Sequence, residues 1–376
     1  TDVAERDFPP FDLARLLGSV FEPTQGMKVC ILIDLENLQD VKNFAFLKND
    51  SLTVQRYAYE AFHQGLHGGA MEELGMTGGD FFAYHISGGS NLDLRDEAVQ
   101  STGREVSLEK DVYPYYDIIL CISTFSATAP LTALAKQHGF RGATLHGLNE
   151  IILKSGLCVD YREVSADAEK LRLAVTGADE IEIDFAIEGG RAVTCKLELG
   201  GQEAQKSHGL CHGTTPDIAN LPAGEVYFVP KGAEGEFPLK YEDGTLGLLE
   251  VRGGRIRKSE LVEEHNAKLK ADPMTGVLGE LGLGTQVLPV SGSDIQDEKI
   301  LGTCHLATGR DDHLGGDITP DLFKEHANAT HDDILFAPHK TPNFDITQVR
   351  MKRGDQEEVL IEHFRPMPYL LKALAR

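Results

Sequence analysis

The sequence predicts a protein of two domains, an N-terminal α/β domain with an open sheet and a C-terminal, β-rich α+β domain. Three observations support this fold class. Short apolar runs alternate with helical spacing in the first part of the chain. Glycine-punctuated, alternating strands dominate after about residue 165. The length of 376 residues also exceeds what one compact core usually takes. We therefore expect the domains to span residues 1–165 and 166–376.

Four strands are predicted in the N-terminal part, and the continuous apolar run of the first suits a strand that is covered on both faces, as in a parallel sheet. They span residues 27–34, 81–86, 117–123 and 141–147. Residues 54–62 show helical spacing, and residues 129–138 predict a helix with Pro130 in its first turn and Gly139 as its stop. The first strand is followed by acidic residues and not by glycines, which argues against a dinucleotide-binding loop.

In the C-terminal part, residues 180–187 and 191–199 alternate polar and apolar positions on either side of Gly189-Gly190. This pattern predicts a hairpin with one buried face. Further strands are expected at residues 225–230, 244–252 and 334–337, and one helix at residues 259–271.

Charge and cysteine content narrow the class of partner. The net charge of −23, from 36 basic and 59 acidic residues, disfavours nucleic acid and anionic lipid surfaces. No apolar run is long enough to span a bilayer, and the first residues lack the pattern of a secretory signal. The six cysteines are scattered without a CxxC pair, which favours a reduced, cytoplasmic protein. We expect a small peptide or small molecule as the partner.

Residues 280–333 contain the side chains best suited to chemistry. His331 and Asp333 are two positions apart, so on a strand an imidazole and a carboxylate would point to the same face. A further imidazole and carboxylates from neighbouring strands would complete a metal site of the nitrogen and oxygen mix that Zn²⁺ accepts. With 14 histidines and 59 acidic residues in the chain, a partly exposed polar strand is the alternative interpretation.

Several motifs occur in the order found in the aminopeptidase T family of metallopeptidases. They are Gly-Ala-Asp at 177–179, Asn-Leu-Pro-Ala-Gly-Glu-Val-Tyr-Phe-Val-Pro at 220–230, Leu-Gly-Glu at 278–280, His-Leu-Ala-Thr-Gly at 305–309 and His-Asp-Asp at 331–333. The chain resembles that family over roughly residues 170–340.

The resemblance implies two divalent metal ions, of Zn, Co or Mn. It also implies their ligands, which are Glu225, Glu280, His305, His331 and Asp333. Two such ions would lower the pKa of a bound water and polarise a peptide carbonyl. The resemblance therefore implies a metallo-aminopeptidase-like hydrolase that cleaves a peptide or amide bond, and a homodimer.

Two features depart from the family pattern. The family has a catalytic tyrosine shortly after its first histidine motif, where this chain has Arg-Asp-Asp-His at residues 310–313. His313 is our candidate for a substitute hydrogen-bond donor, so the catalytic residues we expect are Glu280 and His313. In addition, residues 1–160 do not visibly match the family's N-terminal domain, which leaves the substrate open.

Two other functions remain open at this point. A related branch of the fold is similar to 2,5-dihydroxypyridine dioxygenase, in which His305, His331 and Asp333 would hold one Fe(II). Glu225 and Glu280 favour the two-metal hydrolase, because a single-iron site has less use for both. The other alternative is a non-catalytic binding protein that keeps the fold.

Overall fold

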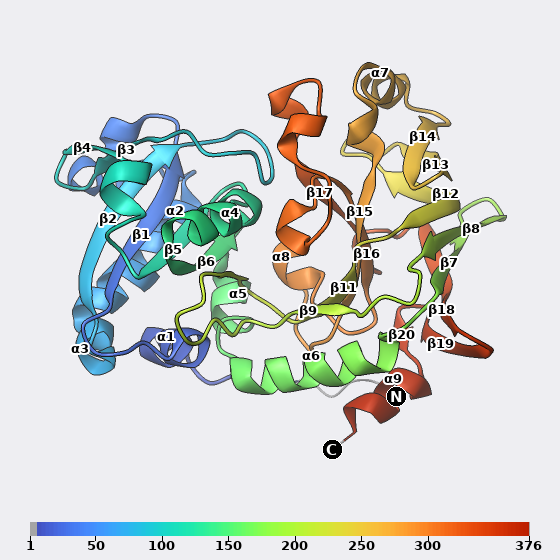
Figure 1. Ribbon diagram of the computed structural model, residues 1–376, viewed down its shortest axis with the longest axis horizontal. Helices are drawn as coiled ribbons and strands as arrows, with labels where there is room; N and C mark the ends of the chain where they lie inside the picture. Colours follow the sequence, from blue (N-terminus) through green and yellow to red (C-terminus); the bar gives the residue numbers. More distant parts are fainter. Residues whose placement is uncertain (1–5, 376) are drawn as a thin grey trace. The chain divides into compact units, whose positions relative to one another are not determined.

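The structure, a computed structural model, describes residues 6–375 and divides into two compact units (Figure 1). The first unit takes the chain up to Ser165 together with His208–Ala223 and Leu288–Gln296. The second takes Ala166–Ser207, Gly224–Val287 and the chain from Asp297 on. The mixed α/β and β-rich character expected from the sequence is confirmed, with three sheets in all. The sequence does not indicate that residues 208–223 and 288–296 belong to the first unit. The division into domains at residue 165 stays a prediction.

The first unit contains a seven-stranded sheet in the order β10-β6-β5-β1-β2-β3-β4. Its strands are β1 (Lys28–Leu35), β2 (Thr77–His85), β3 (Glu97–Gln100), β4 (Glu105–Ser107), β5 (Ile118–Ser123), β6 (Arg141–His146) and β10 (Ile218–Asn220). From β10 to β2 neighbouring strands are parallel, and β3 and β4 add an antiparallel edge. The four predicted parallel strands are confirmed.

Most of the helices belong to the first unit. They are α1 (Leu13–Phe21), η1 (Leu38–Lys48), α2 (Thr53–Tyr57), η2 (Ala58–His63), η3 (Leu66–Ala70), α3 (Met71–Leu74), η4 (Leu108–Val112), α4 (Thr128–His138) and α5 (Glu150–Lys154). The helix α6 (Tyr161–Val175) begins in the first unit and continues into the second. The helix predicted at residues 129–138 is α4, and Gly139 ends it in the left-handed conformation, with φ of 87°. Within residues 6–375, no helix is both long and apolar enough to cross a membrane.

The second unit contains two antiparallel sheets, in the orders β14-β13-β12-β8-β7-β18-β19-β20 and β17-β16-β15-β11-β9. Their strands are β7 (Glu180–Ile187), β8 (Arg191–Glu198), β9 (Gln205–Ser207), β11 (Glu225–Phe228), β12 (Gly232–Lys240), β13 (Leu246–Arg252), β14 (Arg255–Ser259), β15 (Leu278–Gly284), β16 (Cys304–Gly309), β17 (His331–Phe336), β18 (Phe344–Arg353), β19 (Gln356–Glu362) and β20 (Arg365–Pro366). The predicted hairpin is β7 and β8.

Short helices connect these strands: α7 (Glu263–Ala271), η5 (Pro273–Gly276), α8 (Asp294–Asp297), η6 (Asp312–Leu314), η7 (Pro320–Leu322), η8 (His326–Asn328) and α9 (Pro368–Leu374). The helix predicted from residue 259 is α7 and begins four residues later. Ser259 instead ends β14, where it pairs with Leu249. The Asn266 side chain also binds both the backbone N–H and the carbonyl of Ser259, which holds that residue in the strand.

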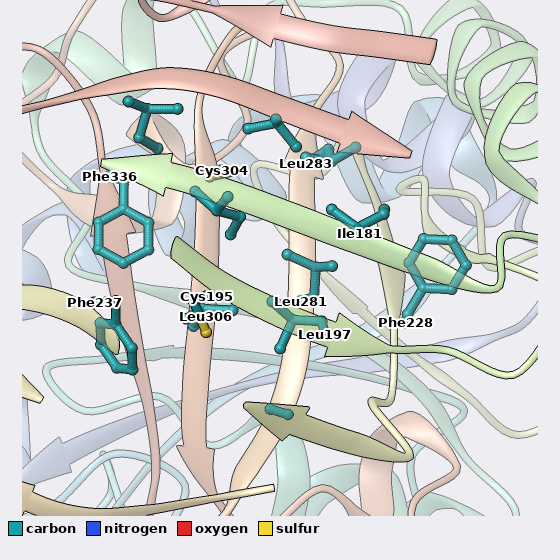
Figure 2. Close-up of a cluster of buried hydrophobic side chains, with 14 of the residues drawn as sticks. Ile181, Cys195, Leu197, Phe228, Phe237, Leu281, Leu283, Cys304, Leu306 and Phe336 are labelled. Carbon is teal, nitrogen blue, oxygen red and sulfur yellow. The ribbon is translucent and has the colours of Figure 1, made fainter. Parts of the chain in front are cut away.

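The two sheets of the second unit pack face to face around a shared apolar core (Figure 2). Leu281 and Leu306 of the five-stranded sheet meet Ile181 and Leu197 of the larger sheet in this core. The ring of Phe336 on β17 also lies 5.1 Å from that of Phe185 on β7, centroid to centroid. Because side chains alternate along a strand, the neighbours of these core residues project from the opposite face of the five-stranded sheet.

All six cysteines are buried and unpaired, as expected for core thiols.

Candidate metal centre

The face of the five-stranded sheet that lies opposite the core carries all five residues predicted as ligands. They are Glu225 on β11, Glu280 on β15, His305 on β16, and His331 and Asp333 on β17. Glu280 lies opposite Ala307, which lies opposite Asp333, and His305 lies opposite Gly282. Directly paired residues of antiparallel strands point to the same face, so the ladder brings the five side chains together.

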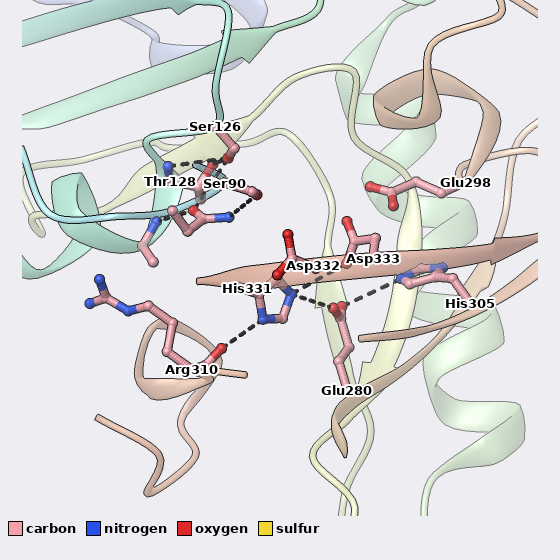
Figure 3. Close-up of polar contacts among 12 residues, drawn as sticks. Ser90, Ser126, Thr128, Glu280, Glu298, His305, Arg310, His331, Asp332 and Asp333 are labelled. Atoms are coloured by element: carbon pink, nitrogen blue, oxygen red, sulfur yellow. Dashed lines mark hydrogen bonds and ion pairs between the residues drawn. The ribbon is translucent and has the colours of Figure 1, made fainter. Parts of the chain in front are cut away.

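The side chains form two groups in which one ligand atom of each residue lies within 4.8 Å of the others. In one group, Nε2 of His331 lies 3.0 Å from Oε2 of Glu280 and 3.3 Å from Oδ1 of Asp333 (Figure 3). The other group consists of His305, Glu225 and Glu298. Nε2 of His305 lies 3.3 Å from Oε2 of Glu225. Oε1 of Glu280 lies 3.5 Å from Nε2 of His305, so this carboxylate connects the two groups.

Glycine makes room for the centre. A Cβ atom on Gly282 would lie 2.2 Å from Cε1 of His305, so any side chain there would displace the imidazole. Gly284, two residues further on the same face, lies against the backbone of Ile300, and a Cβ atom would lie 2.2 Å from that carbonyl oxygen. Small residues between the polar ones therefore leave space above the strands for two imidazole rings and their carboxylate partners.

The hydrogen bonding of His331 fixes which of its nitrogens can act as a ligand. Nδ1 lies 2.6 Å from the backbone carbonyl oxygen of Arg310, which can only accept, so Nδ1–H donates to it. Nε2 then faces Glu280 and Asp333 with either a proton or a lone pair. A lone pair between two carboxylates is repulsive unless a cation lies among them, and the outer hydrogen bond from Nδ1 suits a histidine that binds a metal ion through Nε2.

The second group is short of hydrogen bonds. Within the described residues, both ring nitrogens of His305, Oε2 of Glu225 and Oε2 of Glu298 are buried without a hydrogen-bond partner. Close contacts exist between them, but their geometry is not that of hydrogen bonds. Leaving such atoms buried and unpaired is costly, and a cation coordinated by them would remove that cost. Both groups could therefore hold metal ions.

Without a metal ion, the side chains of the centre hold protons among them. Burial raises the pKa of Glu225 to about 8. Burial opposes the ionisation of Glu280 too, but its contacts with His305 and His331 hold the pKa of that carboxyl well below its usual range. Burial disfavours charge on His305, yet Glu225 and Glu280 raise its pKa to about 10. Protons on the imidazoles thus balance the carboxylates wherever no metal ion does so.

Glu298 is a candidate ligand that sequence reasoning missed. It follows α8 in a loop and not on a strand, so it shares no alternation with the other ligands. Its only sequence signal is its position in the acidic pair at residues 297 and 298, within the stretch that carries the other motifs. The carboxylate is buried and forms an ion pair of 2.8 Å with Lys299, whose side chain is fully buried. Burial opposes ionisation, but the charge of Lys299 keeps the pKa of Glu298 below its usual value.

His313, the predicted donor, lies beside the centre. Its ring is perpendicular to that of His331, with centroids 4.7 Å apart. Among the described residues, its buried Nδ1 has no hydrogen-bond partner. Burial and the nearby charge of His331 lower its pKa well below the usual value, so the ring is neutral at physiological pH. A neutral imidazole can donate from one nitrogen, which is what the prediction requires.

Access to the centre is uneven. The side chain of Asp333 is 30% exposed, while the other four predicted ligands are at most 9% exposed. Asp333 also lines a cavity of about 330 Å³ together with Leu239, Phe344 and the lysines Lys240 and Lys340. The group that contains Asp333 thus borders a cavity.

Comparisons of this chain with protein-family models, with curated proteins and with solved structures found no significant match. The fold and the site define the class as a mixed α/β protein with two candidate metal positions on one face of a sheet. The resemblance to the aminopeptidase T family stays an interpretation of its motifs.

Proposed function

We propose that this protein is a metal-dependent hydrolase, resembling an aminopeptidase, that cleaves a peptide or amide bond next to a free amino terminus. One observation carries the proposal. The two carboxylate oxygens of Glu280 each face a different histidine, at 3.0 Å for His331 and 3.5 Å for His305. A carboxylate shared in this way suits a pair of metal ions, because each of its oxygens can serve one ion.

The mixture of imidazole and carboxylate ligands supports divalent ions of the borderline kind, Zn²⁺, Co²⁺ or Mn²⁺. Two such ions, when bound, would supply an activated water and polarise the substrate carbonyl. The residues of the chain then have distinct roles. The carbonyl of Arg310 keeps Nε2 of His331 directed at the centre. The neutral ring of His313 is our candidate donor to the oxygen that gains negative charge during attack.

The single-iron alternative receives less support from the grouping of the side chains. A ring-cleaving dioxygenase would use His305, His331 and Asp333 around one ion. Here His305 belongs with Glu225 and Glu298, whereas His331 and Asp333 belong with Glu280. Four carboxylates in two groups are more than one Fe(II) requires.

The test is metal analysis of protein purified without chelators, followed by turnover of aminoacyl p-nitroanilides with Zn²⁺, Co²⁺ or Mn²⁺ supplied. About two ions per chain and hydrolysis that an N-acetyl group on the substrate abolishes are expected. Glu280→Gln should lose both ions and the activity. One iron per chain with oxygen consumption would instead identify the dioxygenase. Ligand binding without metal or turnover would identify a binding protein, and either result overturns the proposal.

A further inference from the structure

Lys299 is a buried cation at the edge of the candidate metal centre, and its backbone is held in place. Its carbonyl oxygen accepts hydrogen bonds from the N–H groups of Thr285 and Gln286, at 3.0 and 2.8 Å. The backbone of the next residue, Ile300, lies so close to Gly284 that a side chain at position 284 would not fit. The Lys299 side chain is 0% exposed. This lysine is therefore fixed beside the end of β15, unlike a mobile surface lysine.

The ammonium group of Lys299 leaves Glu298 one oxygen with which to bind a metal ion. Nζ donates to Oε1 of Glu298 at 2.8 Å, and Oε2 is the buried oxygen that has no partner among residues 6–375. The Glu298 carboxylate belongs to the group with Glu225 and His305, and Oε2 is its oxygen that is not bonded to Lys299. Glu298 can therefore act as a ligand through one oxygen, while its other oxygen stays on the lysine.

The two groups differ in charge for this reason. Once an ion has displaced the proton of Glu225, Glu225 and Glu298 would present two negative charges to it, and the adjacent ammonium would offset one of them. Glu280 and Asp333 would also present two, and their contacts described above are with histidines. The charge of Lys299 acts more strongly on Glu298 and Glu225 than on Asp333. A metal ion needs histidine neutral, so the Glu280 group would present its full charge to an ion. A fixed positive charge in the first group would repel any ion bound there.

We propose that Lys299 makes the two metal positions unequal. The ion held by Glu225, Glu298 and His305 is the weaker, exchangeable one, and the ion held by Glu280, His331 and Asp333 is the tighter one. This inference rests on the proposed function only through the two-metal centre. It assigns Lys299 the part of a positioning residue that orients Glu298 and sets the affinity of one position.

The experiment is calorimetric titration of Mn²⁺ into the full-length protein after its metal has been removed with a chelator. Two binding steps are expected, separated by roughly tenfold or more in affinity. Lys299→Met keeps the volume and removes the charge, so the weaker step should tighten by about tenfold or more and approach the other. Lys299→Arg keeps the charge and should keep the separation. Lys258→Met, at an exposed position on β14, is the matched control and should change neither step.

A second variant makes the test independent of how Lys299→Met folds. Glu298→Gln removes one ligand of the weaker position and should abolish that step alone, which Co²⁺ absorption spectra would report as the loss of one coordination environment. Two equal steps in the wild-type protein, or an unchanged titration of folded Lys299→Met, would overturn the inference. Absence of any binding would overturn both the inference and the metal centre. Two unequal steps without amide turnover would leave the inference standing and contradict the hydrolase.

Discussion

At the scale of single residues, the most sensitive position of the centre is a glycine. Because a Cβ atom on Gly282 would lie 2.2 Å from the His305 ring, Gly282→Ala should force the imidazole out of its place. We expect a loss of bound metal and a fall in the free energy of unfolding of roughly 1–3 kcal/mol, the usual cost of overpacking. Metal analysis and thermal unfolding measure these effects.

Gly68→Ala is the control for this variant, because a Cβ atom there would meet nothing within 4 Å. It should keep full stability and metal content. A Gly282→Ala protein that binds metal as the wild type does would mean that His305 is not a ligand.

His313 provides a test of catalysis separate from metal binding. If its imidazole stabilises the charge that develops on the substrate, His313→Ala should lower kcat by on the order of 10²–10³, with unchanged metal content. His313→Gln keeps a donor and should recover part of the loss. Steady-state kinetics with an aminoacyl p-nitroanilide would decide, and an unchanged kcat would remove His313 from the mechanism.

The ligands on strands could be predicted from the sequence, and Glu298 could not. His331 and Asp333 are two residues apart on one strand, so alternation alone suggests that they share a face. Glu298 reaches the centre because backbone hydrogen bonds at Thr285 and Gln286 hold the following residue. Such contacts between distant backbone groups leave no periodic pattern in the sequence.

At the scale of elements, the loop that carries His313 depends on one buried carboxylate. Oδ1 of Asp311 accepts the N–H of Ile318 at 2.8 Å, and the backbone carbonyl of Asp311 accepts the N–H groups of Leu314 and Gly316. Asp311→Ala removes the first of these bonds, from the partly buried N–H of Ile318, which costs about 0.5–1.5 kcal/mol.

We therefore expect Asp311→Ala to lower kcat through displacement of His313 while both metal ions remain bound. Kinetics and metal analysis on the same preparation measure the two effects. Simultaneous loss of metal would mean that the loop supports the ligands themselves.

The strands differ in how well the sequence predicts them, for a reason connected with the site. The runs of β1 and β5 are mostly apolar, and the sequence predicts both strands correctly. The segment of β15, with Gly279, Gly282 and Gly284 in seven residues, lacks the composition of a strand. Two of those glycines make room for His305 and Ile300. The glycines that the centre requires thus make β15 difficult to predict from the sequence.

At the scale of the whole molecule, stability should depend on pH differently with and without metal. Without metal, the folded-state pKa of Glu225 is about 8, against 4.5 for the ordinary group, and that of His305 is about 10, against 6.5. Both are raised, so the folded state binds more protons than the unfolded chain. The stability of the metal-free protein should therefore fall as the pH rises from about 6 to about 9.

Zn²⁺ in excess should reverse this trend, because it replaces the protons on the ligands and binds the folded state alone. Denaturant unfolding at both pH values, with and without the ion, provides the measurement. A metal-free protein that is more stable at the higher pH would contradict the assignment.

The predicted homodimer is also a property of the whole molecule. The motif resemblance implies it, and light scattering at working concentration is expected to give twice the chain mass of 41.1 kDa. A monomer would mean that the resemblance does not extend to assembly.

The two faces of the five-stranded sheet have a consequence for which changes of chain length the protein can accept. Leu306 packs in the core and His305 faces the centre, although they are neighbours on β16. One residue inserted into or deleted from this strand would exchange its two faces, so that the imidazole would enter the apolar core and the leucine would face the carboxylates of the centre. Among natural variants of this chain, insertions and deletions should accordingly cluster outside β11, β15, β16 and β17, even where point substitutions within those strands are common.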